Sequence, residues 1–486
     1  MFGNLEGLVM PTGQTTRVYA FGLGNIDGGP HALHFHGQQW VITSQRNDVL
    51  ELIPAMTRTF DIRPQFVGDW LLHCHTAVHG ERGMQVIFTV TGSDQSVSSG
   101  VVRRYYIAAE EVDWNYAPSG RNEITGLTFG TSSSSDPRED NMIRSSTTIG
   151  RRVLKGMYKQ YTDSSFNTAV SASAYLGILG PVIRAQVGDK IEIVFKNKMS
   201  FGASMHPLGL LYSNDEDIIP DGPDHIVAAG ATYTYEWWVP SSAGPAANDP
   251  SSISWLYYSK GEGAESHIDT GLVGPIVITR ANSQTSSSDL KPKDVDREFI
   301  ILQSIFREDS SMLWEKNVQL LNVDPADLAF GSNERPHING LMYGNLPGLE
   351  MSLGEKVRWY VMTTGSFDGL HTPHWHGNVV TIGGERTDVI ELFPTSHSVS
   401  DMVADEAGTW LFHCHYSDHL LGGMVATYRI NSTPTPTTPP TSTPNSNGVP
   451  TPTPTPVRPP STSPAHTLVA GWTTLVAVLL MMLACA

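Results

Sequence analysis

Cysteine is scarce in this sequence, which contains only Cys74, Cys414 and Cys485. The first two stand in identical His-Cys-His contexts and the third lies in the C-terminal tail, so no disulfide framework is available to the globular part. Basic residues are also in the minority, because 31 Lys and Arg face 48 Asp and Glu. The resulting net charge of −17 argues against a nucleic acid as partner and is compatible with the attraction of small cations.

Turn-forming residues, by contrast, are abundant. With 45 Gly and 32 Pro among 486 residues, the sequence favours many turns and short strands over long helices. Strand-like runs stand between these turns, at 105–110, 190–195, 233–239, 274–279 and 298–303. The length suits three or four domains, and the pattern predicts an all-β fold of tandem β-sandwich domains.

The sequence repeats itself at a fixed offset. Residues 1–8 resemble residues 342–349, and after a one-residue slip each ligand-type side chain recurs 340 positions later, as in 414 − 74. The pairs are His31 and His371, His34 and His374, His36 and His376, His73 and His413, Cys74 and Cys414, His75 and His415, His79 and His419, and Met84 and Met424. Eight such matches at one offset are not expected by chance, so both copies are predicted to bind metal.

The second copy carries the ligand types of a blue-copper site. Thiolate, imidazole and a weak axial thioether are what such an electron-transfer site needs. Because neighbouring residues of a strand point to opposite faces, Cys414 is expected to face one way and both His413 and His415 the other. One strand would then serve two metal sites. A zinc site is the alternative, but zinc rarely uses Met and does not need eight ligands.

These motifs resemble those of multicopper oxidases of the ceruloplasmin/hephaestin type, a family of ferroxidases. The stretches 111–120, 176–181 and 271–275 add to the resemblance, which covers residues 1–430. It implies tandem cupredoxin-like Greek-key domains and the reduction of O₂ to water with electrons from a small reductant. Copper in type 1, type 2 and type 3 sites is therefore the expected cofactor.

The resemblance also assigns a role to each ligand. In the second copy it implies type 1 ligands His371, Cys414, His419 and Met424, a type 2 ligand His374, and type 3 ligands His376, His413 and His415. In the first copy it implies a type 1 set of His31, Cys74, His79 and Met84, and another half of a trinuclear cluster formed by His34, His36, His73 and His75. Keeping this further half-cluster departs from the family, whose intermediate domains often lose it.

The middle unit departs in the opposite direction. Its segment 204–209 keeps His206 but has Leu208 where the family's first domain has a second histidine, and the other pair falls near 255–259, which contains none. We expect that this unit cannot complete a trinuclear cluster. The partner of the second copy's half-cluster would then lie in a domain missing from this chain or in another subunit. For His206 a structural loop histidine is the favoured interpretation and a type 2 copper ligand the alternative, and His225 and His267 are expected to be surface or loop residues.

The repeat predicts the domain organisation. We expect a partial cupredoxin domain with type 1 ligands at 1–95, a cupredoxin domain without copper ligands at 101–281, and a third with type 1 and half trinuclear ligands at 294–431. Residues 295–341 of the second copy have no counterpart before Met1, and no signal peptide precedes it. An N-terminally truncated chain is the favoured interpretation, and a short natural isoform is the alternative.

The C-terminal end predicts a location. Residues 432–465 are rich in Pro, Thr and Ser, which is typical of an extended, O-glycosylated stalk. Residues 466–486 are apolar and no basic residues follow them, which suits the attachment signal of a lipid (GPI) anchor, with a membrane span as the alternative. We therefore expect a glycoprotein on the extracellular face of the plasma membrane.

Two classes of function stay open. One is a copper ferroxidase in which Cys414 accepts electrons and Asp418 binds Fe(II), because a hard cation prefers carboxylate oxygen. The first copy has Val78 at the position of Asp418. The other class is a non-catalytic cupredoxin-repeat protein of the surface or matrix, and an oxidase of phenols, amines or Cu(I) is a further option.

The remaining ion-binding signals are weaker. Glu334 and His337 are near the positions where the family binds iron but are shifted in register, and Gly331 takes the place of a glutamate. The acidic loop 214–221 could hold calcium, although a merely solvated loop is the favoured interpretation.

Overall fold

The computed structural model of this chain describes residues 4–5, 7–23, 30–42, 45–76, 79–80, 82–94, 100–131, 136–212, 225–261, 264–365 and 369–432. Met1–Thr435 form one unit and Pro436–Ala486 another. The acidic loop, the anchor segment and nearly all of the predicted stalk lie outside the described residues. Among those that are described, no helix is long and apolar enough to cross a membrane.

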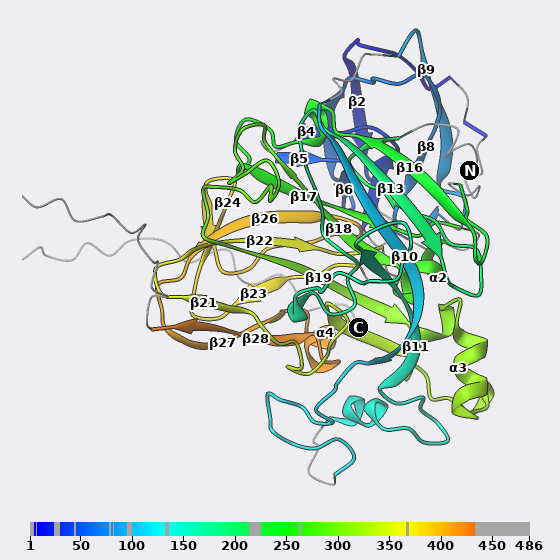
Figure 1. Cartoon of the computed structure of the whole chain (residues 1–486), viewed down its shortest axis with the longest axis vertical. Coiled ribbons are helices and arrows are strands. Elements are labelled where there is room, and N and C mark those ends of the chain that lie inside the picture. Colours follow the sequence, from blue (N-terminus) through cyan, green and yellow to red (C-terminus); the bar gives the residue numbers. More distant parts are fainter. Residues whose placement is uncertain are drawn as a thin grey trace, which may run out of the picture. The chain divides into compact units, whose positions relative to one another are not determined.

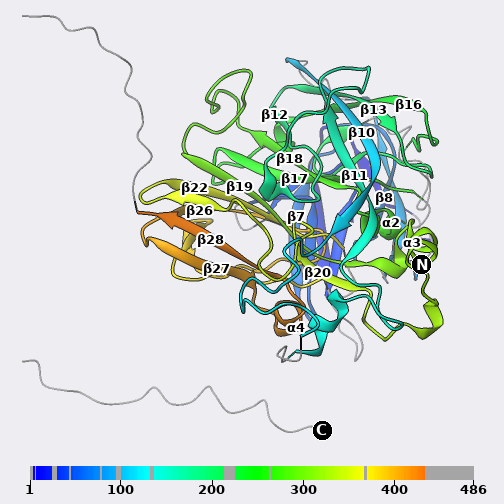
Figure 2. The same cartoon turned by 60° about the horizontal axis from the view of Figure 1, so that its bottom comes forward.

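Strands dominate the second copy of the repeat. They are β19 (Arg297–Arg307), β20 (Glu334–Ile338), β21 (Glu350–Ser352), β22 (Lys356–Met362), β23 (Pro373–Trp375), β24 (Val380–Ile382), β25 (Glu385–Thr387), β26 (His397–Val403), β27 (Gly408–Cys414) and β28 (Val425–Asn431). One sheet has the order β20-β19-β22-β26-β24-β25 and the other β21-β28-β27-β23. Both views show β22 and β26 in one layer and β27 and β28 in the other (Figures 1 and 2), which is the predicted sandwich.

The middle unit has the same plan. Its strands are β10 (Val102–Asn115), β11 (Arg152–Tyr161), β12 (Ile183–Gln186), β13 (Lys190–Asn197), β14 (His206–Pro207), β15 (Leu211–Tyr212), β16 (Thr232–Trp238), β17 (Ser252–Tyr258) and β18 (Val273–Thr279). They form the sheets β11-β10-β13-β16-β15 and β12-β18-β17-β14. In β13, buried Ile191, Ile193 and Phe195 alternate with partly exposed residues, so one face of the strand enters the core.

The first copy contributes a smaller set of strands. They are β1 (Val9–Pro11), β2 (Thr16–Phe21), β3 (His31–Phe35), β4 (Trp40–Ile42), β5 (Gln45–Asn47), β6 (Val49–Leu52), β7 (Thr57–Ile62), β8 (Gly68–Cys74) and β9 (Gln85–Thr91). The main sheet has the order β1-β9-β8-β3-β6, and β2 pairs with β7.

Helices are few and short. In the part of the chain that the structure describes, the α-helices are α2 (Ala264–Thr270), α3 (Trp314–Leu321) and α4 (Ser417–Leu421), and the 3-10 helices are η1 (Pro137–Met142), η2 (Ala174–Leu176), η4 (Ser241–Ala243), η5 (Glu308–Ser310) and η6 (Pro325–Asp327). The all-β expectation is therefore confirmed.

A buried ion pair joins the middle unit to the second copy. Lys155 Nζ lies 2.9 Å from Glu308 Oε1, and both side chains are 0% exposed. The Tyr116 hydroxyl donates to the same carboxylate, and Lys155 also donates to the Asp269 carbonyl. Removal from water costs each ion several kcal/mol, which these contacts offset only while both partners are present.

Replacement of Lys155 should therefore be costly. We expect Lys155→Met to lower the free energy of unfolding by about 3–5 kcal/mol, because Glu308 is left buried without its cation. The matched control is Arg152→Met on the same strand, whose ion pair with Asp113 leaves both side chains 62% exposed, so its loss should lower the free energy of unfolding far less. Urea unfolding measures both variants, and equal losses would contradict a special role for the buried pair.

Candidate metal centres

In each copy two antiparallel strands present the histidines. His34 on β3 pairs with His73 on β8, and His374 on β23 pairs with His413 on β27. Strand alternation then turns the residue after His413, Cys414, to the opposite face. The structure confirms this expectation, because Cys414 Sγ lies near His419 while His413 faces the other histidines.

The Cys414 site has the predicted type 1 composition. Cys414 Sγ lies 3.5 Å from His419 Nδ1. The ligand atoms of His371, Cys414 and His419 all lie within 4.8 Å of one another, and all three residues are buried. Neither ring nitrogen of His371 has a hydrogen-bond partner among the described residues, although this side chain is 0% exposed. Buried unpaired nitrogens call for an explanation, and a bound metal ion supplies one.

The spacing in this site fits a metal ion. An Sγ–Nδ1 separation of 3.5 Å would allow both atoms to bind one ion. One thiolate and two imidazoles are the donors that a blue-copper site would use. Met424 is 0% exposed, and its carbonyl accepts a hydrogen bond from the Cys414 N–H at 3.2 Å, which places it beside the site as predicted.

The surroundings of Cys414 affect the hydrogen bonding of its sulfur and the protonation of the site's side chains. The Thr372 N–H lies 3.4 Å from Cys414 Sγ as a donor. Burial raises the pKa of the Cys414 thiol, so a metal must displace its proton on binding. Burial also lowers the pKa of His419 to about 4, which keeps this imidazole neutral and available as a ligand at pH 7. Thr372 was not among the sequence-based candidates.

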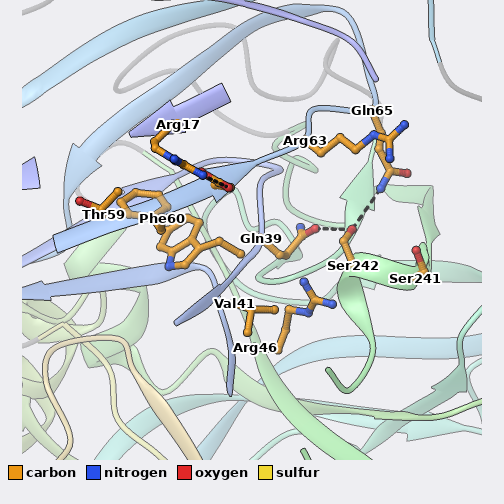
Figure 3. Close-up of a pocket in the computed structure, with 12 residues that line it drawn as sticks. Arg17, Gln39, Val41, Arg46, Thr59, Phe60, Arg63, Gln65, Ser241 and Ser242 are labelled. Atoms are coloured by element: carbon orange, nitrogen blue, oxygen red, sulfur yellow. Dashed lines mark hydrogen bonds and ion pairs between the residues drawn. The ribbon is translucent and has the colours of Figure 1, made fainter. Parts of the chain in front are cut away.

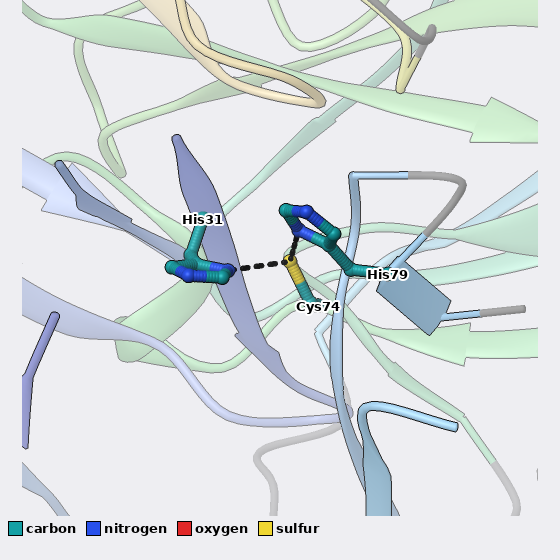
Figure 4. A group of neighbouring side chains, drawn as sticks. All are labelled: His31, Cys74 and His79. Carbon is teal, nitrogen blue, oxygen red and sulfur yellow. Dashed lines mark hydrogen bonds between the residues drawn. The ribbon is translucent and has the colours of Figure 1, made fainter. Parts of the chain in front are cut away.

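The first copy has the same group of residues, but its two histidines are less buried than those of the second copy. His31 and His79 approach the Cys74 sulfur at 3.8 and 3.5 Å (Figure 4). The Ala32 N–H donates to Cys74 Sγ at 3.4 Å, as Thr372 does in the second copy. Met84, however, is 42% exposed. Met424, its counterpart in the second copy, is 0% exposed.

The second copy's cluster histidines gather on the other face of β27. His376 Nε2 lies 2.9 Å from His413 Nε2, and the ligand atoms of His374, His376 and His413 lie within 4.8 Å of one another. His413 Nδ1 lies 2.8 Å from the Cys414 carbonyl. Its N–H can donate there, which leaves Nε2 as the ligand atom and links the two metal sites by a hydrogen bond as well as by the backbone. His415 is exposed on this face.

The first copy's cluster histidines are covered instead. His34, His36 and His75 are 2%, 1% and 7% exposed. His36 Nε2 lies 3.1 Å from His73 Nε2. The cover comes from the middle unit, because the His36 ring centroid lies 5.3 Å from that of His206 and His36 Nδ1 lies 3.4 Å from the Tyr212 hydroxyl.

The middle unit has the same strand pairing as the two copies at this position, but most of the predicted metal ligands are replaced by other residues. His206 pairs with Tyr258 in the register of His34 with His73 and of His374 with His413. Ser259 then takes the place of the cysteine, and its N–H donates to the Leu272 carbonyl at 3.0 Å, as the Cys414 N–H does to that of Met424. Lys260 stands at the position of His75 and His415.

Two expectations about middle-unit histidines are wrong. His206 lies on strand β14 and is 1% exposed, so it is not a loop residue. His267 lies on α2, is 2% exposed, and its Nδ1 lies 2.8 Å from Ser259 Oγ. This histidine therefore stands near the cysteine position as His419 does near Cys414, with a hydroxyl in place of the thiol. His225 is exposed, as expected.

The η1 helix contacts Asp418, whose carboxylate is the predicted iron ligand. Arg138 Nη2 lies 3.3 Å from Asp418 Oδ1, and the side chain of Asp418 is 75% exposed. Arg138 belongs to η1, and no sequence signal linked residues 280 positions apart. His337 is 0% exposed, and its Nδ1 accepts from the Gly340 N–H, so it faces the interior and not a surface ion.

A separate pocket of about 560 Å³ lies between the first copy and the middle unit (Figure 3). Ser242 bridges its two walls, because its hydroxyl donates to Gln39 and accepts from Gln65. Arg17, Arg46 and Arg63 also line this pocket, and Arg17 pairs with Asp61. None of the sixteen predicted copper ligands lines it, so it is not an electron-entry site.

Comparison with known proteins identifies relatives. A multicopper oxidase family model matches residues 2–94 and 316–434, and a second one matches residues 176–283. Ceruloplasmin of Rattus norvegicus is 38% identical over 451 residues, which cover 88% of this chain and 42% of that protein. Hephaestin of Homo sapiens is 33% identical over 458 residues, with coverages of 89% and 38%. A ferroxidase of Homo sapiens is 33% identical over 451 residues, with the same coverages.

The chain thus spans about two fifths of the length of these relatives. A solved multicopper oxidase structure overlays with a TM-score of 0.44 at 18% identity, covering 68% of this chain and 89% of that one, so the assignment rests on the sequence relationship. On that basis the chain belongs to the multicopper oxidase family, in the branch of ceruloplasmin and hephaestin.

Proposed function

We propose that this chain is the copper-bearing part of a ferroxidase that takes electrons from Fe(II) at the Cys414 site. The observation that carries the proposal is the arrangement around α4, where His419 approaches Cys414 Sγ at 3.5 Å and the neighbouring Asp418 carboxylate faces solvent. A relative named as a ferroxidase, 33% identical over 451 residues, supports this choice of reductant.

Bound copper would accept single electrons at the Cys414 site and, in a complete trinuclear cluster, pass them to O₂. The protein's own residues set up each part of that task. Asp418 offers oxygen to a hard cation near the buried thiolate. The Cys414 carbonyl and His413 Nδ1, 2.8 Å apart, connect the buried sulfur with the histidine face of β27.

The second copy's cluster face supports a further part of the proposal. His415 is exposed, and His374 and His376 are only partly buried. Imidazoles grouped in this way on an open surface fit a half-site that another domain or subunit completes, as the family resemblance implies. In the chain alone, His413 and its neighbours offer one side of a cluster.

The location of the protein belongs to the same proposal. The stalk at 432–465 and the anchor signal at 466–486 favour a lipid-anchored glycoprotein at the cell surface, where Fe(II) would be met outside the cell. Calcium binding by 214–221 stays a prediction from the sequence, because that loop lies outside the described residues.

Copper content and colour test the first step. We expect the copper-loaded chain to show intense blue absorption from two thiolate sites, about half of which is lost in either Cys74→Ser or Cys414→Ser. The double variant should be colourless in this band. A chain that binds no copper, or whose colour is unaffected by Cys414→Ser, would favour the non-catalytic alternative.

Fe(II) kinetics test the role of Asp418. The Arg138 guanidinium competes with a cation for this carboxylate, so Asp418→Asn and Arg138→Gln should act in opposite directions. We expect Asp418→Asn to lower kcat/KM for Fe(II) by about 10-fold and Arg138→Gln to raise it by about 2- to 5-fold, as a weak exposed ion pair allows.

A neutral phenol serves as the control substrate in both variants. Its kcat/KM should change little, because it places no positive charge near Asp418. Parallel changes for Fe(II) and the phenol would show that the site is perturbed as a whole and that Asp418 does not bind iron.

Oxygen turnover tests the need for a further domain. We expect Fe(II) to bleach the blue absorption of the isolated chain with about two electrons per chain, one for each thiolate site, and air to restore the colour slowly. Stopped-flow absorbance and an oxygen electrode measure the two steps. Rapid, sustained consumption of four Fe(II) per O₂ by the isolated monomer would overturn this part of the proposal.

A further inference from the structure

The pocket shown in Figure 3 is separate from the predicted copper sites. Its volume of about 560 Å³ lies in the range of sites for small molecules. One wall comes from β2, β4, β5 and β7 of the first copy, and the other comes from η4 of the middle unit. Val41, which lines the pocket, is 44% exposed, so a ligand could enter from solvent.

The charge of the pocket is opposite to that of the chain. Its lining includes the three arginines Arg17, Arg46 and Arg63 but only one carboxylate, that of Asp61. The lining therefore has an excess of two positive charges, whereas the whole chain has a net charge of −17. A concave site lined mainly by charges of one sign concentrates small ions of the opposite sign. Anions are therefore the expected ligands.

Two of these arginines have hydrogen-bond donors to spare. Arg17 is already paired with Asp61 through two hydrogen bonds, of 2.8 and 3.0 Å. Arg46 and Arg63 each donate their Nε–H to a backbone carbonyl, at 3.3 and 2.9 Å. Neither Nη1 nor Nη2 of these two side chains has a hydrogen-bond partner among the described residues. With Nε held in place, the two terminal nitrogens present the planar donor pair that binds a carboxylate or phosphate group in a bidentate manner.

The guanidinium of Arg46 also lacks a close counter-charge. Asp249 accepts a hydrogen bond from the backbone N–H of Arg46 at 3.1 Å, and no ion pair joins this carboxylate to the Arg46 side chain in the described part of the chain. Burial lowers the pKa of Arg46, and the charge of Asp249 acts in the opposite direction. A negative charge beside the guanidinium favours its charged form, so a bound anion would offset the effect of burial.

Neutral polar groups connect the two walls. The Ser242 hydroxyl donates to Gln39 Oε1 at 2.8 Å and accepts from Gln65 Nε2 at 3.1 Å. In the view of Figure 3, Arg63 lies on one side of this hydrogen-bonded series and Arg46 on the other. The series therefore fixes the wall of the middle unit against the wall that carries the arginines.

Part of the lining is apolar. The side chains of Trp40 and Phe60, whose ring centroids lie 4.6 Å apart, line the pocket together with Val41. Hydrocarbon surface of this kind accommodates the carbon skeleton of a ligand, while the few polar groups determine its orientation. The lining as a whole therefore fits a compact organic anion better than a simple halide.

The second copy does not repeat the residues of this pocket. At the offset of 340 positions, Val403 takes the place of Arg63, and Asp405 takes the place of Gln65. The second copy thus has an apolar side chain and a carboxylate where the first copy has a cation and an amide. The charge of the pocket belongs to the first copy alone, unlike the predicted metal ligands, which recur in both copies.

We propose that this pocket binds a compact organic anion that carries a carboxylate or phosphate group, held between the guanidinium groups of Arg46 and Arg63. Because both arginines belong to the first copy and Ser242 on the opposite wall belongs to the middle unit, the bound anion also stabilises the junction of the two units. The site does not depend on the proposed oxidase function, since no predicted copper ligand lines the pocket.

Isothermal titration calorimetry of the full chain tests the site with two probes, succinate and inorganic phosphate, at constant ionic strength. We expect at least one probe to bind with one equivalent per chain. The control is succinamide, which resembles succinate in shape but has no charge and should bind about 10-fold more weakly or less. Tighter binding of succinate or of phosphate identifies the ligand group. No saturable binding of either probe, or equal binding of succinate and succinamide, would overturn the proposal.

Matched charge substitutions locate the bound anion. Arg46→Gln and Arg63→Gln should each weaken binding by about 10-fold, because each removes a charged donor pair from the anion. Arg58→Gln removes the same charge from β7 but should leave the affinity unchanged, because Arg58 does not line the pocket.

A further variant should act in the opposite direction. Asp61→Asn removes the only carboxylate among the lining residues and releases Arg17, so we expect it to strengthen binding by about 2- to 5-fold. Misfolding cannot produce such a gain, and Asp61 and Arg63 are both exposed, so these two variants serve even where Arg46→Gln does not fold. Equal affinities in Arg63→Gln, Asp61→Asn and Arg58→Gln would show that the anion binds elsewhere and would overturn the site.

Discussion

The pleat of one strand is the constraint on which the metal chemistry of this chain depends. Because successive side chains of β27 point to opposite faces, Cys414 joins the buried residues His371 and His419 while His413 joins the histidine face. No loop could hold both groups one peptide apart in this way. The same strand is paired on both edges, with β23 and β28, so its pleat cannot slip without breaking both ladders.

Much of this arrangement could be predicted from the sequence. Cys414, its flanking histidines and their copies at an offset of 340 determined the ligand sets, and the residues brought together in space are the predicted ones. Short strands between Gly and Pro determined the fold class. Each of these signals is local or periodic, so it survives without knowledge of tertiary contacts.

Other features depended on contacts that no local pattern encodes. The pairing of Arg138 with Asp418 joins residues 280 positions apart, and its strength depends on where η1 packs. The burial of His206 and His267 follows from the pairing of β14 with β17 and from the packing of α2, which is why both were mistaken for loop residues. Met84 matches Met424 in sequence, yet it is 42% exposed whereas Met424 is 0% exposed, a difference that no local pattern predicts.

The middle unit keeps the strand framework of these sites without their cysteine. Ser259 takes the cysteine position, the Ser204 N–H donates to its hydroxyl at 3.0 Å as Thr372 does to Cys414 Sγ, and His267 approaches it from the side that His419 occupies in the second copy. A hydroxyl can satisfy the hydrogen bonds that a thiolate satisfies, but it binds soft metals poorly. Hydrogen bonds and strand pairing therefore hold this framework in place, and the units differ in the side chains that the framework presents.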